Sequence, residues 1–323
     1  MNPKGPASEN LPELPRPSTR LAERPEIKRL LSVYLRTLTS PRTINTYNTE
    51  IRMFLAFVGE RLGLEELGEI TAEDVSLYRE HLLKTYAPAT VAKKLVALRR
   101  FLTFTYMGGA TAINPEALRF FAKSPKVGQD SSYNVFTQGE LSRMLRAARL
   151  KNHRDYVLLA VLAGAGLREA EVVGVKIGDF REVQEGQVLL RVAGKGGKTR
   201  AVPISPELWQ LVQRHVLLSG RSLASRADAR KPLFASREGC NKPLTTRSVR
   251  YIVKKYADDA GITKAISPHS IRHTVGTNMA VNEAPLLVIQ QFLGHSDPKT
   301  TMRYVRRAEE LATRAYQYNT LPL

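Results

Sequence analysis

The segment SPHSIRH, residues 267–273, places basic side chains at the predicted start of a helix. Ser267 is a good N-cap and proline is favoured at the first helical position, so we expect a helix from Pro268. His269 then lies in the first turn, and Arg272, three residues later, shares its face. Because free N–H groups point outward at a helix N-terminus, this surface should bind an anion. The alternative is an ordinary capped helix with an exposed arginine.

Arg168 and Glu171 follow directly after the apolar run at residues 157–167. A buried run would hold Arg168 rigidly, and Glu171 is placed to accept a hydrogen bond from a neighbouring arginine or histidine and to orient it. A weak ion pair on a helix surface is the alternative. Lys195 lies in the glycine-rich segment GKGGK, where it can reach into a site and give up a proton. Otherwise it stays solvated or contacts DNA phosphates.

A histidine and a tyrosine stand near the end of the chain. A predicted helix with apolar residues on its inner face ends at Gly294, so His295 comes just past a helix end. Tyr304 follows nine residues later, among arginines. Taken alone, this tyrosine has the pattern of an amphipathic residue at the edge of a core.

Together, these side chains match the requirements of metal-free DNA strand transfer. The scissile phosphodiester carries one negative charge and its transition state carries two, so paired guanidiniums compensate the added charge. A tyrosine phenol supplies the nucleophile, His269 can take its proton, and His295 can donate to a non-bridging oxygen. Lys195 can protonate the departing 5′ oxygen, and a covalent phosphotyrosine needs no ATP or other cofactor for religation. The set, in chain order, is Arg168, Lys195, His269, Arg272, His295 and Tyr304.

These motifs resemble those of the tyrosine recombinase (phage integrase) family over residues 26–323. Ile271 replaces the usual leucine, and Val305-Arg306 stands where many Xer-type members have Thr-His; neither departure touches a catalytic role. The matching features are GLREAE at 166–171, GKG at 194–196, HSIRH at 269–273, LGH at 293–295, the tyrosine nine residues after that histidine, and, nearer the N-terminus, Thr43, Tyr47, the helix at 89–104 and Asn114-Pro115.

The resemblance implies a mainly α fold that closes on DNA as a C-shaped clamp. Its first part would be an N-terminal helical, SAM-like core-binding domain, and its second a mainly helical catalytic domain with a small β-sheet. The implied activity is site-specific recombination, in which DNA strands are cut and rejoined through a 3′-phosphotyrosine. The implied roles are Tyr304 as nucleophile, Arg168, Arg272 and His295 as transition-state stabilisers, Lys195 as general acid, His269 as general base, and Glu171 as their support.

The resemblance also implies how the chain meets double-stranded DNA. The family inserts the start of one helix into the major groove, here the helix after Thr245 with Arg247 and Arg250. The analogous candidates in the first domain are Asn45, Thr90, Lys93 and Lys94, and a solvated surface residue is the alternative for each. Residues after Tyr304, with Leu311, Ala315, Tyr316 and Tyr318, resemble the family's exchanged C-terminal segment. They imply a tetramer on paired inverted half-sites, formed with itself or with a paralogous recombinase, and an accessory activator stays open.

Composition agrees with a DNA partner. The 323 residues include 49 Lys and Arg against 30 Asp and Glu, a net charge of +19, and the sequence pI is about 10.1. Such an excess favours a polyanion, with nucleic acid ahead of an anionic membrane surface. The longest apolar run, residues 157–167, is far shorter than the ~20 residues of a membrane span. A single cysteine, Cys240, excludes an internal disulfide and a cysteine-based zinc site, and we expect a buried free thiol in a cytoplasmic protein without metal or cofactor.

Helical spacing and turn residues divide the chain into domains. We expect a flexible proline-rich leader at 1–25, a helical DNA-binding domain at 26–122, a polar linker at 123–134 and a catalytic domain at 135–323. Strand patterns at 188–192 and 200–204, joined by the GKGGK segment, predict a β-hairpin. Helices should account for most of the remaining chain.

Other functions remain in competition at this stage. A type IB topoisomerase or a hairpin telomere resolvase would share these catalytic residues. A non-catalytic DNA-binding regulator would have no need for Tyr304, and a two-metal nuclease would need a carboxylate cluster that the sequence does not mark. The target sequence and the biological task, among chromosome dimer resolution, plasmid resolution and mobile-element integration, are not encoded in the motifs.

Overall fold

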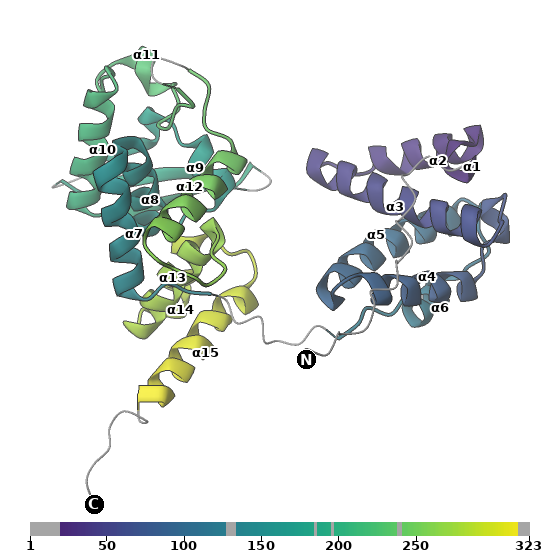
Figure 1. Cartoon of the computed structure of the whole chain (residues 1–323). Coiled ribbons are helices and arrows are strands. Elements are labelled where there is room, and N and C mark those ends of the chain that lie inside the picture. The colour runs from purple at the N-terminus through teal and green to yellow at the C-terminus, as the bar shows by residue number, and fades with distance from the viewer. Residues whose placement is uncertain (1–19, 127–133, 184–185, 195–196, 238–240, 316–323) are drawn as a thin grey trace, which may run out of the picture. The chain divides into compact units, whose positions relative to one another are not determined.

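The computed structural model describes residues 20–126, 134–183, 186–194, 197–237 and 241–315. The chain divides into two compact units, Met1–Ser131 and Ser132–Leu323, and the division falls inside the expected linker. Figure 1 shows that helices dominate both units. No helix in the described ranges is long and apolar enough to cross a membrane. Lys195, Cys240, Tyr316 and Tyr318 lie outside the described residues.

The first unit is built only of helices in its described part. Four of its helices begin with proline, which suits the first helical position because its fixed φ is already helical. α4 instead begins with a capping box between Thr71 and Asp74. The helices are α1 (Arg20–Glu23), α2 (Pro25–Arg36), α3 (Pro41–Arg61), α4 (Ala72–Thr85), α5 (Pro88–Met107) and α6 (Pro115–Phe121), with the 3-10 turn η1 (Leu67–Glu69) between α3 and α4.

The core of this unit starts earlier than the sequence predicts. α1 precedes the expected domain start at residue 26, and its Leu21 and Ala22 are buried. The apolar pair is short and is flanked by prolines, so helical spacing in the sequence does not reveal it. The expected leader therefore contains residues that belong to the first core.

The second unit combines nine helices with a small antiparallel sheet within its described residues. The sheet order is β1-β2-β3, and Val188 pairs with Ile204 in the predicted hairpin. β1 was not predicted, because three residues are too few to show an alternating pattern. The elements are α7 (Gln138–Lys151), α8 (His153–Ala165), α9 (Glu169–Gly174), η2 (Ile177–Asp179), β1 (Phe180–Glu182), β2 (Val188–Ala193), β3 (Thr199–Ile204), α10 (Pro206–Leu218), α11 (Arg226–Ala229), α12 (Thr246–Asp259), α13 (Pro268–Val281), α14 (Leu286–Leu293) and α15 (Pro298–Ala315).

The apolar run at residues 157–167 forms most of α8 and the turn after it. α8 packs against α7, α10, α13 and β3, which explains why its side chains beyond the first turn are apolar. It ends at Gly166, whose φ of 58° lies in the left-handed region. Arg168 thus follows directly after the end of a buried helix, as the sequence predicts.

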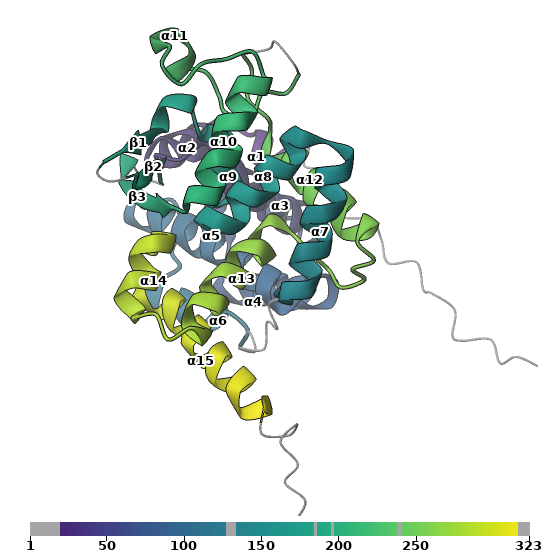
Figure 2. The same cartoon turned by 90° about the vertical axis from the view of Figure 1, so that its left-hand side faces the viewer.

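α15 begins beside α13 and α14 and then leaves them. Its Thr301 and Tyr304 are buried against these helices. Figure 1 and Figure 2 show the later part of α15 extending beyond the other helices of this unit. Its backbone is helical as far as Ala315, and the side chains of Leu311 and Ala315 lie outside the described part.

Candidate active site

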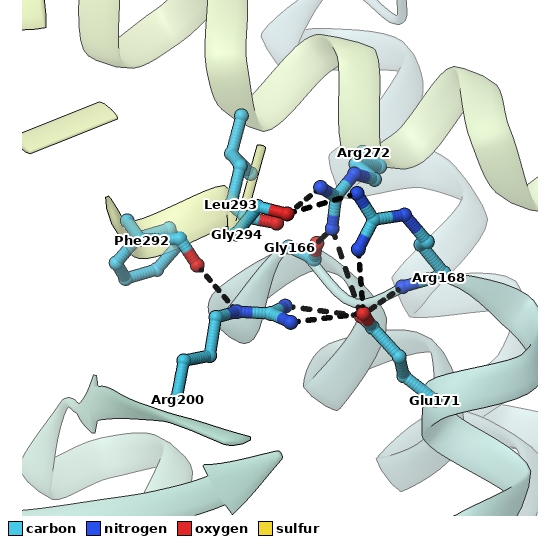
Figure 3. A network of polar contacts seen from close by, with 8 residues as sticks. All are labelled: Gly166, Arg168, Glu171, Arg200, Arg272, Phe292, Leu293 and Gly294. Atoms are coloured by element: carbon cyan, nitrogen blue, oxygen red, sulfur yellow. Dashed lines mark hydrogen bonds and ion pairs between the residues drawn. The ribbon is translucent and has the colours of Figure 1, made fainter. Parts of the chain in front are cut away.

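The carboxylate of Glu171 contacts three guanidiniums in the second unit (Figure 3). Glu171 Oε1 accepts from Arg168 Nη1 at 2.6 Å and from Arg200 Nη1 at 2.8 Å, while Oε2 accepts from Arg200 Nη2 at 3.0 Å. Arg272 Nη1 lies 3.6 Å from Oε2. Burial alone would raise the pKa of the Glu171 carboxyl, but the hydrogen bonds from Arg200 and Arg168 outweigh burial and lower it to about 2. Three positive groups and one negative group leave a net charge of +2.

Arg272 is completely buried, with a relative exposure of 0%. Its Nη1 donates to the Gly166 carbonyl at 2.6 Å and its Nη2 donates to the Leu293 carbonyl. These carbonyls close α8 and α14, where helix dipoles place partial negative charge. Burial, and then the nearby Arg168, lowers the pKa of Arg272 to about 10, so the guanidinium stays protonated at neutral pH. Its buried Nε has no acceptor among the described residues.

Arg168 differs from Arg272 by reaching the solvent. Its side chain is 37% exposed, and its Nη2 donates to the Gly294 carbonyl at 3.1 Å. Its backbone N–H donates to Glu171 Oε2 at 2.8 Å, which fixes the carboxylate at the start of α9. Glu171 therefore contacts both Arg168 and Arg272, and the start of α9 fixes its position.

Arg200 is the member of the cluster that sequence reasoning missed. Besides both oxygens of Glu171, it binds the Phe292 carbonyl through Nε at 3.0 Å. The strand pattern could have revealed it. Arg200 is two residues from the buried Val202 and four from the buried Ile204, so all three side chains lie on the same face of β3. A charged residue on the inward face of a strand requires a buried partner, and here that partner is Glu171.

Gly294 permits the close approach between β3 and the end of α14. Its φ is 64°, and a Cβ at this position would come within 2.7 Å of Arg200 Cδ. A side chain would therefore be strained by its backbone and would also displace the Arg200 guanidinium. The glycine of the LGH motif is explained by both constraints.

Tyr304 is surrounded by imidazoles and is only 4% exposed. Its phenol oxygen lies 3.0 Å from His273 Nδ1, and its ring stacks with that of His295 at a centroid distance of 5.8 Å. His295 Nδ1 in turn meets Thr301 Oγ1 at 2.9 Å. His269 packs edge-on against His273 at 4.4 Å, so it stands one ring away from the tyrosine. Sequence reasoning gave His273 no role, although it is part of HSIRH.

The histidines of this cluster are neutral at pH 7. Burial lowers the pKa of His269, His273 and His295, and the positive charges of Arg272 and Arg168 lower those of His269 and His295 further. The pKa falls to about 3 for His273 and to about 4 for His295. Neutral imidazoles can accept a proton or donate a neutral N–H, depending on which ring nitrogen carries hydrogen. Five of the six expected catalytic residues therefore gather in one place, and Lys195 lies outside the described residues.

The residues expected to read DNA differ in their solvent exposure and in their contacts with other side chains. Asn45, Thr90, Lys93 and Arg247 are exposed. Arg250 is exposed, but its Nε donates to Glu169 Oε2 at 2.7 Å.

Lys94 faces the interior of the first unit instead of the solvent. It is 7% exposed, and its ammonium pairs with Glu50 at 2.5 Å and lies 4.5 Å from the centre of the Tyr86 ring. The alternation of helix faces explains the contrast with Lys93, which is the preceding residue on α5. This placement favours a structural role for Lys94.

The chain is similar in sequence and fold to known proteins. XerC of Pelobacter propionicus, a tyrosine recombinase, is 32% identical over 272 residues that cover 82% of this chain and 84% of that protein. XerD of Lacticaseibacillus casei is 29% identical over 276 residues that cover 84% and 89%. Among solved structures, XerH bound to its palindromic difH substrate gives a TM-score of 0.67 at 21% identity, covering 85% of this chain and 79% of that chain. A lambda integrase dimer bound to a COC′ core site gives 0.65 at 16% identity, covering 86% and 94%.

The fold and the site define an enzyme that breaks and rejoins DNA strands. Family models narrow the class: the phage integrase family matches residues 134–310, and the phage integrase N-terminal SAM-like domain matches residues 29–108. The chain belongs to the phage integrase family and is a site-specific tyrosine recombinase. This settles the competition with the regulator, nuclease and topoisomerase hypotheses in favour of recombination.

Proposed function

We propose that Tyr304 attacks the scissile phosphate within the guanidinium cluster and forms a 3′-phosphotyrosine, releasing a 5′ hydroxyl. The observation that carries this assignment is the buried Nε of Arg272, a donor without an acceptor in the described part of the chain. A non-bridging phosphate oxygen would satisfy it. The phenol of Tyr304 lies 3.0 Å from Nδ1 of His273, the residue that follows Arg272 on α13. The proposed nucleophile and the proposed phosphate-binding guanidinium are therefore both in contact with, or part of, the same helix.

Charge favours the transition state over the bound substrate. Three guanidiniums less one carboxylate give +2, and a phosphodiester at −1 becomes −2 in its five-coordinate transition state. The site therefore matches the charge that develops during reaction, which is the preorganised stabilisation that accelerates chemistry. Losing one such donor typically costs ~2.7–4 kcal/mol of barrier.

Proton movements are assigned to the neutral histidines and to Lys195. His269, neutral beside Arg272, is the proposed acceptor of the phenol proton. Because the His273 ring stands between His269 and Tyr304, this transfer requires the phenol to turn from His273 into hydrogen-bond reach of His269 when DNA binds. Thr301 orients His295, which donates its other ring N–H to a non-bridging oxygen. Lys195 stays the proposed general acid for the departing 5′ oxygen.

The chain acts on DNA, and we propose its assembly by analogy with its relatives. XerH is bound to a palindromic substrate in its solved complex, and relatives of this chain include both XerC and XerD proteins. These support a tetramer on paired inverted half-sites, formed from one chain or with a paralogue. The reaction would occur in the cytoplasm, on chromosomal, plasmid or mobile-element DNA. Arg247, Arg250, Lys93, Thr90 and Asn45 are the proposed reading residues.

Covalent trapping tests the proposal. Wild type and Tyr304→Phe are incubated with fragmented host DNA, denatured, and the ends of protein-linked fragments are sequenced. We expect adducts only in the wild type, at a 3′ phosphate and at one shared sequence. Adducts that persist in Tyr304→Phe would overturn the assignment of the nucleophile. Adducts scattered over unrelated sequences would contradict site-specific cleavage.

A further inference from the structure

Helix α13 offers Tyr304 two contacts that none of the roles assigned so far requires. The first is the hydrogen bond between the phenol oxygen and His273 Nδ1, at 3.0 Å. The second lies one turn further along α13 at Gly276, where a Cβ would meet the Tyr304 ring at 2.7 to 2.8 Å. Positions three apart on a helix share a face, so both contacts come from the same side of α13.

Gly276 determines how deeply the tyrosine ring can sit. The ring atoms Cδ2, Cε2 and Cζ occupy the volume that any side chain at this position would need. Gly276 is itself buried within α13, where glycine has poor helix propensity and gains nothing from a left-handed φ. The observation that explains it is the ring lying directly on the helix backbone.

His273 fixes the other end of the ring. It is 7% exposed and is the residue after Arg272, so the two side chains leave α13 in different directions. Arg272 turns to the carbonyls of Gly166 and Leu293, while His273 turns to α15. A single helix therefore holds the phosphate-binding guanidinium and the nucleophile at a fixed spacing.

We infer that His273 and Gly276 form a seat on α13 that aims the Tyr304 phenol at the phosphate held by Arg272. His273 is then a positioning residue for strand cleavage, and not the base that removes the proton. The inference rests on the proposed role of Tyr304 as nucleophile.

The electrostatics of the seat support positioning over proton transfer. Burial first, and then the neighbouring His269, Arg272, His295 and Arg303, lower the pKa of His273 to about 3. An imidazole that resists protonation this strongly is a poor base near pH 7. It still makes a neutral hydrogen bond with the phenol, whichever partner donates.

Single-turnover cleavage of the trapped target site tests the seat. Protein is held in excess over DNA, so that the maximal rate of adduct formation separates from the concentration giving half-maximal rate. We expect His273→Leu to lower the maximal rate about 10- to 100-fold, since small misplacement of a nucleophile costs that much, and to leave the half-maximal concentration unchanged. His273→Asn, whose amide can replace Nδ1, should restore most of the rate.

Dependence on pH separates positioning from base catalysis. If His273 only positions the phenol, the rate of His273→Leu falls by the same factor at every pH at which the protein stays folded. A deficit that disappears as the pH rises would show hydroxide replacing a lost base and would overturn the inference. Faster cleavage in His273→Leu would overturn it too, because the contact would then hold the phenol away from the phosphate.

Two matched variants control for folding. His215 is 7% exposed, as His273 is, and its ring nitrogen Nε2 hydrogen-bonds the backbone carbonyl of Leu233, far from the tyrosine in the chain. His215→Leu should therefore lose comparable stability yet cleave normally at neutral pH. Gly276→Ala should slow cleavage with unchanged DNA binding, whereas Gly139→Ala, on the more open α7, should not.

The outcomes separate this inference from the proposed function. If Tyr304→Phe abolishes adducts and His273→Leu cleaves at the wild-type rate, the seat is refuted and the nucleophile stands. If Tyr304→Phe still forms adducts, both the seat and the assignment of Tyr304 as nucleophile are refuted.

Discussion

Acidification from pH 7 to pH 5 should destabilise the second unit through three buried histidines. Burial lowers the pKa of His215 to about 4, that of His273 to about 3 and that of His295 to about 4. The ordinary pKa of a histidine side chain, 6.5, applies to each of them in the unfolded chain. Between about pH 6.5 and pH 4 these three histidines are therefore protonated in the unfolded state and neutral in the folded state. Stability is lost as the pH falls through this window.

The size of the loss follows from the same values. At pH 5 each unfolded histidine is almost fully protonated and each folded one is almost neutral, which costs about 2 kcal/mol per histidine. At pH 7 the cost is only about 0.2 kcal/mol each. Summed over the three as independent groups, about 5 to 6 kcal/mol disappears between the two pH values. That loss approaches the whole stability of a typical domain, ~5–15 kcal/mol.

The chain carries its own probe for this experiment. Trp209 is the single tryptophan and lies in the second unit, stacked on Phe180 at a centroid distance of 5.3 Å. Urea unfolding followed by tryptophan fluorescence at pH values between 7 and 5 gives the free energy of unfolding of this unit. His215→Leu removes one titrating group away from the site, so its loss should fall to about 4 kcal/mol.

Two results would refute the reasoning. One is a change in the free energy of unfolding below about 1 kcal/mol between pH 7 and pH 5, which would mean that the imidazoles are protonated in the folded state. The other is a full wild-type pH dependence in His215→Leu, which would assign the loss to other groups.

Four further substitutions test the arginine cluster and the two lysines of α5. Arg200→Lys keeps the charge but loses the two-point bond to Glu171, so we expect single-turnover cleavage to slow by about 10-fold or more while gel-shift affinity stays unchanged. Gly294→Ala should lower both the thermal melting temperature and the cleavage rate, because its Cβ would strike Arg200; unchanged values would refute the close approach. Lys93→Met should weaken DNA binding and reduce the slope of log affinity against log salt by about 1. Lys94→Met should leave that slope intact and lower the free energy of unfolding by about 1–3 kcal/mol, because it leaves the half-buried Glu50 carboxylate without its partner.

Local patterns in the sequence were enough to predict most elements and most of the site. Pro268 after a good N-cap does begin α13, and the apolar run before Arg168 is a buried helix. These features depend on neighbours within a few residues, which a sequence displays directly. The glycine of LGH was likewise recognised as a helix end, although its second function needed the structure.

Residues whose roles depend on distant partners were harder to predict. Arg200 meets Phe292, and His273 meets Tyr304, across separations that no local spacing reveals. The family resemblance made Lys94 a candidate for DNA contact, but its ammonium instead contacts Glu50 and the Tyr86 ring inside the first unit. In each case the sequence shows the type of the residue, but its role depends on a contact with a residue far away in the chain.

The excess positive charge of the site affects both Arg272 and the neighbouring histidines. A guanidinium with 0% exposure keeps its charge only because carbonyls at the ends of α8 and α14 and the carboxylate of Glu171 surround it. That excess charge helps to keep His269 and His295 neutral. A bound phosphodiester would cancel part of the excess and raise the pKa of both histidines. DNA bearing the target site should therefore bind with proton uptake near pH 5 to 6, and it should protect the second unit from acid most strongly where the free protein is least stable. Isothermal titration in two buffers of different ionisation enthalpy measures this uptake, and zero net uptake at pH 5.5 would break the proposed link between phosphate binding and the neutral histidines.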